Sequence, residues 1–212
     1  MAKKKYIALP KPYISYSQLS QWQRDPRQYK DIYFDNRDEL RTTNAGMAYG
    51  KVVADALEHG VETDDLLTDA AMLLLPKYDI ADVEMRVDMK TKDGWITLLA
   101  KPDSLDSKTK AFMEYKTGKV AWTQAKAQGH LQMHFYATAI YLAHKVIPDC
   151  KLVWIETEWI DGIVKPTGHV EEFTVTLTMK DILACMALIS RTAKAIEIAY
   201  AAHVPNKELL EY

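Results

Sequence analysis

Cysteine is scarce in this sequence, with only Cys150 and Cys185 among 212 residues. Two cysteines do not make a disulfide framework, and they are too few for a four-cysteine iron–sulfur cluster. Long apolar runs are also lacking: none approaches the ~20 residues that span a bilayer, and no apolar stretch follows the basic start MAKKKYIALPKPY. We therefore expect a cytoplasmic protein without a signal peptide and without contact to a membrane.

An excess of either charge is absent, because 27 basic and 29 acidic residues leave a net charge of −2. This balance argues against a protein coated in basic residues, such as a histone-like packager, but a local basic groove could still bind nucleic acid. A hydrophobic content of 48% is typical of a globular protein. The length suits one core, so we expect an irregular segment over residues 1–14 and a single domain over residues 15–212.

Apolar spacing and capping signals divide the chain into helices and strands. The capping signals are Ser15 or Ser17 and Asn44 as N-caps, Gly60 as a stop, and Thr178 with Asp181 at capping-box spacing. The expected helices cover residues 15–34 (with Pro26 ending the first helix or opening a second), 44–60, 63–76, 122–144 and 178–202. The expected strands cover residues 82–89, 94–106, 111–117, 151–160 and 169–177, the first three as consecutive antiparallel pairs. This order predicts an α/β or α+β fold with one mixed central β-sheet flanked by helices.

The stretch FMEYKTGK places an acid and a base two positions apart in the third expected strand. Side chains alternate along a strand, so Glu114 and Lys116 point the same way, roughly 7 Å apart along the chain. A surface ion pair, worth at most about 1 kcal/mol, is one interpretation. A metal-dependent active site is the other.

The preceding hairpin brings a second carboxylate to this pair. If its loop consists of residues 107–110, Asp103 lies directly opposite Glu114, with Cα atoms about 4.5–5.5 Å apart. Two like charges there repel each other, and a Mg²⁺ ion offsets that repulsion. Lys116 on the same face could hold a water or neutralise phosphate charge. Spacing alone leaves a solvated hairpin face as an equal alternative to this catalytic set.

The segment KPDSLD…EYKTGK resembles motifs II and III of the PD-(D/E)XK nuclease superfamily. Further segments are similar to motifs of its RecB-like exonuclease branch, and they occur in the expected order. These are SYSQLSQWQRDPRQY for the Ser-x-Ser…Pro-x-x-Tyr segment, YGKVVADALE for the Gly…His-x-x-Leu-Glu helix, and HLQMHFYA for the Gln-x-x-x-Tyr helix. Together they extend from Ser15 to about Tyr141, well over half of the chain.

The resemblance implies hydrolysis of DNA phosphodiester bonds with Mg²⁺ or Mn²⁺ as cofactor. It implies that Asp103, Glu114 and the carbonyl of Tyr115 bind the metal and that Lys116 orients the attacking water. It also implies that Gln132 and Tyr136, four residues apart on one helix face, meet the substrate strand.

Basic residues near this site are further candidates for contacts with DNA. Lys116, Lys119 and Lys126 flank the proposed site and could attract phosphates. We expect His130 to lie near the DNA. His130 and His134 could instead bind a transition metal together, although the zinc-protease pattern requires a glutamate where this sequence has Leu131.

Three positions depart from the motifs. Ala54 occupies the slot that usually carries a histidine ligand, Asp25 occupies the slot of a cluster cysteine, and Lys101-Pro102 replaces a small residue before the motif aspartate. The iron–sulfur variants are thus excluded. We expect a stand-alone, phage-type DNA exonuclease of recombination or repair, in a bacterial or phage-infected cell. A catalytically impaired DNA-binding protein is the alternative, and a homo-oligomer or a recombination partner protein remains open.

Overall fold

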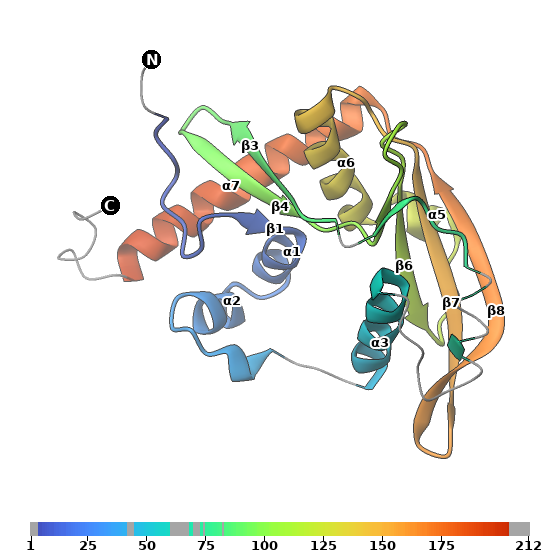
Figure 1. The fold of residues 1–212 in the computed structure, drawn as a ribbon. Coiled ribbons are helices and arrows are strands. Elements are labelled where there is room, and N and C mark those ends of the chain that lie inside the picture. The colour runs from blue at the N-terminus through green and yellow to red at the C-terminus, as the bar shows by residue number, and fades with distance from the viewer. Residues whose placement is uncertain are drawn as a thin grey trace.

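The computed structural model describes residues 4–41, 45–59, 68–69, 73, 75–81 and 83–203. Two mixed β-sheets and the helices around them make up this part of the chain. The predicted α/β class, a mixed sheet flanked by helices, is confirmed. Figure 1 shows helix α6 (Leu131–His144) between the two sheets, with the long helix α7 (Met179–His203) packed beside it.

The N-terminal part is helical, as predicted. Its elements are β1 (Ile14–Ser15), α1 (Tyr16–Arg24), α2 (Pro26–Tyr33), the 3₁₀ helix η1 (Asp38–Leu40) and α3 (Ala45–His59). Ser15 is the N-cap of α1, and its hydroxyl accepts a hydrogen bond from the Gln18 backbone N–H at 3.3 Å. Of the two roles expected for Pro26, the structure has the second: it opens α2, where a missing N–H costs nothing.

Asp25 joins α1 to α2 and provides a test of local stability. Its Oδ1 accepts hydrogen bonds from the backbone N–H groups of Arg27 (3.0 Å) and Gln28 (3.1 Å). Asp25→Ala removes this N-cap, and we expect it to lower the free energy of unfolding by about 1 kcal/mol. Urea denaturation followed by tryptophan fluorescence measures the change. Asp31→Ala, within the same helix but not at its cap, should change stability less, and equal losses would contradict the capping role.

The strands form two sheets, where the sequence predicted one. A three-stranded sheet has the order β1-β4-β3, with β3 (Met85–Lys90) and β4 (Trp95–Ala100) antiparallel. A five-stranded sheet has the order β2-β5-β6-β7-β8. Its strands are β2 (Ile80–Ala81), β5 (Ser104–Leu105), β6 (Phe112–Gly118), β7 (Cys150–Ile160) and β8 (Ile163–Val175). Parallel β6–β7 pairing makes this second sheet mixed.

The division arises within the second predicted strand, residues 94–106. That strand breaks after Ala100, so its first part is β4 in one sheet and its last part is β5 in the other. Pro102 lies in the break, and proline has no N–H to give to a strand ladder. The predicted single run therefore crosses from one sheet to the next.

The register predicted for the following hairpin is confirmed. Ser104 pairs with Met113 and Leu105 with Phe112, and the N–H of Asp106 donates to the carbonyl of Ala111 at 2.8 Å. Asp103 therefore directly precedes β5, and the same register places it opposite Glu114.

Two C-terminal predictions need correction. The long helix expected over 122–144 is two helices, α5 (Gln124–Gln128) and α6, because Gly129 (φ −87°, ψ 2°) and His130 (ψ 111°) leave helical geometry. The turn expected before the last strand is only Asp161-Gly162, whose φ angles of 51° and 80° form a tight hairpin turn. Strand β8 thus begins at Ile163, earlier than predicted.

The start of α7 matches its predicted capping box. The backbone N–H of Thr178 donates to Asp181 Oδ2 at 2.8 Å. Most of the helix expected over residues 63–76, together with the expected cap Asn44 and stop Gly60, lies outside the described residues. Within the described part of the chain, no helix combines the length and the apolar character needed to cross a membrane.

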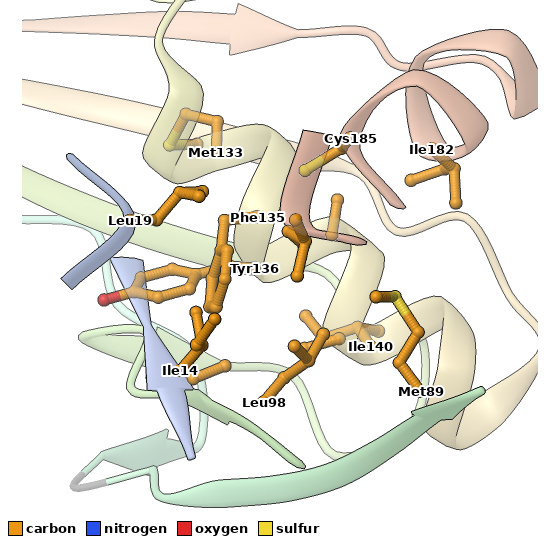
Figure 2. Close-up of a cluster of buried hydrophobic side chains, with 14 of the residues drawn as sticks. Ile14, Leu19, Met89, Leu98, Met133, Phe135, Tyr136, Ile140, Ile182 and Cys185 are labelled. Carbon is orange, nitrogen blue, oxygen red and sulfur yellow. The ribbon is translucent and has the colours of Figure 1, made fainter. Parts of the chain in front are cut away.

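The main core surrounds α6. Figure 2 shows Phe135, Tyr136 and Ile140 of this helix among side chains of both neighbouring layers. The neighbours drawn there include Ile14 of β1, Leu98 of β4, Met89 of β3, and Ile182 and Cys185 of α7. Because α6 is held on several sides, the polar side chains that it carries have fixed positions.

Candidate active site

Strand β6 carries the candidate site on one of its faces. Met113 and Tyr115 point to one side, where they pack with Val53 of α3 in a small second core. Glu114 and Lys116 alternate with them and point to the other side, toward α6. The strand thus has an apolar face and a charged face, as the period of two in FMEYKTGK predicted.

Four polar side chains from β6 and α6 form one hydrogen-bonded network. Lys116 Nζ lies 2.7 Å from Glu114 Oε1 and 2.8 Å from Gln132 Oε1. Gln132 Nε2 donates to the same Glu114 oxygen and to the Tyr136 hydroxyl, at 3.0 Å from the latter. Gln132 and Tyr136 were predicted to share a helix face, and the structure brings that face to the acid–base pair.

Burial dominates the electrostatics of this network. The Glu114 side chain is 4% exposed, and the Lys116 side chain is 26% exposed. Burial raises the pKa of Glu114, although Lys116 and Gln132 oppose the rise. Burial alone would lower the pKa of Lys116, but the Glu114 carboxylate outweighs it, and the pKa is raised. The pair is therefore no solvated surface ion pair, the alternative left open by the sequence.

Asp103 adjoins the network from the end of β5. Its Oδ2 accepts a hydrogen bond of 2.7 Å from the backbone N–H of Tyr115, the residue between Glu114 and Lys116. Its charge also contributes to raising the pKa of Lys116. The sequence-predicted set of Asp103, Glu114 and Lys116 is thus gathered around one stretch of β6.

The site offers few groups that could bind a hard divalent cation. Glu114 Oε2 is buried and has no hydrogen-bond partner among the described residues, as expected of an oxygen reserved for a cation. Mg²⁺ binds through one or two carboxylates and keeps several waters. Glu114 and Asp103 could supply the two carboxylates. The described residues contain no group of three or more His, Cys, Asp or Glu side chains that could hold a metal. Ala54 lies within α3 and adds no ligand.

Lys119 and His130 are the remaining residues that were predicted to contact DNA. Lys119 is exposed in the loop after β6. His130 lies between the rings of Tyr16 and Trp122, at centroid distances of 6.0 and 5.0 Å. Burial and the nearby charges of Lys116 and Lys126 lower the pKa of His130 to about 4, so its ring is neutral at pH 7.

His134 contacts the backbone of the preceding helix. One of its ring nitrogens, Nε2, is 2.9 Å from the carbonyl oxygen of Gln128. Neither histidine belongs to a candidate metal cluster among the residues that the structure describes. The zinc alternative therefore has no geometric support.

The sequence did not point to a pocket beside the site, at the start of α1. It has a volume of about 220 Å³, and its lining includes Lys11, Arg41, Lys101 and Tyr136. These residues lie far apart in the sequence, so no local pattern could have grouped them. The cation–π contact between Lys126 and Trp122, at 4.0 Å, was equally absent from the predictions.

Comparisons with known proteins give structural matches only. The sequence matches no family model and no curated protein. A candidate exonuclease from Eubacterium rectale, known from its crystal structure, superposes with a TM-score of 0.56. The two are 10% identical, and the match covers 92% of this chain and 83% of the other.

A second crystal structure, that of SSO0001, gives a TM-score of 0.50 at 13% identity. This match covers 87% of the present chain and 77% of SSO0001. Identities this low show a shared fold and nothing about activity. The chain therefore shares the overall α/β fold of these two structures.

Proposed function

We propose that this protein is a metal-dependent deoxyribonuclease of the RecB-like PD-(D/E)XK branch, acting as an exonuclease in recombination, repair or phage DNA metabolism. The observation that carries the proposal is the buried Glu114 with its unpartnered oxygen, next to Lys116 and Asp103 on one face of β6. The nuclease-like fold supports it. The proposed location is the cytoplasm of a bacterial or phage-infected cell.

Each residue of the site has a separate task. Asp103, Glu114 and the carbonyl of Tyr115 would hold Mg²⁺ or Mn²⁺. When bound, the ion would supply a Lewis acid at the scissile phosphate and lower the pKa of its water. Lys116, partly exposed, would orient the attacking water and offset negative charge on the phosphate.

Gln132 positions the acid and the base of this site. It bonds Glu114 Oε1 through its Nε2 and Lys116 through its Oε1, so it holds both side chains at once. Its buried position on α6 fixes that geometry before any substrate binds. Tyr136, Lys119 and His130 would line the path of the DNA strand, and Lys126 beside Trp122 would add a further cation.

The alternative is a nuclease-fold protein that binds DNA without cutting it. Two observations favour it: Ala54 stands in a slot where a histidine ligand is usual, and the described residues contain no group of three metal-binding side chains. Two carboxylates and one carbonyl hold a cation more weakly than a complete set of ligands.

A cleavage assay separates the two functions. Labelled single- and double-stranded DNA is incubated with the protein and either Mg²⁺, Mn²⁺ or EDTA, and binding is measured in parallel by fluorescence anisotropy. Degradation that requires the cation and proceeds from a DNA end supports the exonuclease. Binding without products under every condition would establish the non-cutting alternative.

Ala54→His tests whether one missing ligand limits activity. If it does, the variant should cleave at least about tenfold faster at low Mn²⁺ concentration. Even the groups that only orient metal ligands change metal affinity by roughly 10–100-fold, and a direct ligand should change it at least as much. Ala48→His, at an exposed position of the same helix, is the matched control. Equal rates for wild type and both variants would show that position 54 does not limit metal binding.

A further inference from the structure

The pocket at the start of α1 is separated from the candidate site by one side chain. Tyr136 lines the pocket, and its hydroxyl accepts the hydrogen bond from Gln132 that belongs to the site network. Figure 2 shows the Tyr136 hydroxyl directed toward the N-terminal segment that carries Ile14 and Leu19. A group bound in this pocket would therefore lie next to the network of Glu114 and Lys116.

The charge of the pocket is positive. Its lining contains Lys11, Arg41 and Lys101 and no acidic residue. Two of these cations have carboxylate partners outside the lining: Arg41 pairs with Asp38 at 2.8 Å and Lys101 with Glu84 at 2.7 Å. Lys11 makes no ion pair with any residue that the structure describes. The lining thus keeps an uncompensated positive charge.

Neutral hydrogen-bond donors complete the lining. The pocket includes Ser15, Tyr16 and Ser17, and α1 has no acidic residue in its first turn. One N–H group of this helix start, that of Gln18, already donates to Ser15 Oγ, and the remaining N–H groups favour an anion. The tyrosines Tyr13 and Tyr33 add hydroxyl groups, and Tyr33 already accepts a hydrogen bond from Arg41 at 3.3 Å. Cations, hydroxyls and backbone amides together suit a small oxyanion with several acceptor oxygens.

We propose that this pocket binds a phosphate monoester. The identity of the ligand rests on the proposed function: either the terminal phosphate of a nucleic-acid strand or a released nucleoside monophosphate. The volume of about 220 Å³ is below the roughly 300–1,000 Å³ of pockets for drug-sized ligands, and it matches a compact charged group. A terminal phosphate held here would place the end of a strand beside Glu114, which favours cutting at ends.

Binding of short oligonucleotides in EDTA tests the pocket without cleavage. The probes are one labelled ten-nucleotide DNA strand with a 5′-phosphate, a 3′-phosphate or hydroxyls at both ends. One of the phosphorylated strands should bind about tenfold more tightly than the hydroxyl strand, because charged hydrogen bonds to phosphate are strong. Lys11→Gln and Lys101→Gln should remove most of this preference and change binding of the hydroxyl strand less than about twofold. Lys180→Gln, at an exposed site on α7, should keep the preference.

A deoxynucleoside monophosphate and inorganic phosphate, titrated by calorimetry, distinguish the two sources. If they bind through Lys11 but no phosphorylated strand gains affinity, the pocket receives the released product. If neither a phosphorylated strand nor the deoxynucleoside monophosphate nor inorganic phosphate binds through Lys11, or if Lys11→Gln weakens all probes equally, the hydroxyl strand included, the proposal is overturned. Phosphate-dependent binding by a protein that cuts no DNA would leave the pocket in place and refute only the proposed nuclease function.

Discussion

Glu114→Gln is expected to lower the rate of DNA cleavage by about 100- to 1,000-fold, an effect of the size seen when a group that stabilises transition-state charge is removed. The substitution keeps the shape of the side chain and removes the anionic oxygen that would bind a cation. It also removes the carboxylate partner that Lys116 contacts at 2.7 Å. Initial rates on end-labelled DNA in Mn²⁺ measure the loss.

Glu172→Gln provides the matched control for this experiment. Glu172 makes an exposed ion pair with Lys151 at 2.8 Å, on strands β7 and β8. The same chemical change there should leave the rate unchanged, since exposed ion pairs contribute little. If Glu114→Gln retained more than a tenth of the wild-type rate while circular dichroism showed a native fold, Glu114 would have no part in the chemistry.

Ile140→Ala is expected to lower the free energy of unfolding by about 2–5 kcal/mol. Ile140 is fully buried, and Figure 2 shows it facing Leu98 and Met89 of the three-stranded sheet. Removing its outer carbons leaves a cavity between α6 and that sheet. Because a domain is stable by only about 5–15 kcal/mol, this loss should be obvious in a urea unfolding curve.

Ile198→Ala is the matched control for the core. Ile198 lies on α7 and is 61% exposed, so the same truncation removes little buried surface. Its effect should be within about 0.5 kcal/mol. A similar midpoint of urea unfolding for the two variants would mean that the packing described above does not stabilise α6.

Local patterns were sufficient for much of the fold. The alternation in β6, the cap at Ser15, the capping box of Thr178 and the register of Ser104 with Met113 all depend on residues close in sequence. Each involves a pattern with a fixed period or a short loop, so a sequence can specify it without knowledge of distant partners.

Other features depend on partners far along the chain. Pro102, which lies in the break, can be seen in the sequence. The division into two sheets instead of one cannot, because it depends on which strands pair on either side of the break. Similarly, the contact of Gln132 with Lys116 follows from the packing of α6 against β6. The pocket shared by Lys11 and Arg41 joins residues that no periodic pattern connects.

The crossing between the sheets leaves both carboxylates of the candidate site on the same side of it. Asp103 follows directly after Pro102 and adjoins β5, and Glu114 lies on β6, the neighbour of β5 in the five-stranded sheet. The hydrogen bond from the Tyr115 N–H to Asp103 joins these two positions within one sheet. A movement of the three-stranded sheet about Pro102 would therefore leave the separation of the two carboxylates unchanged.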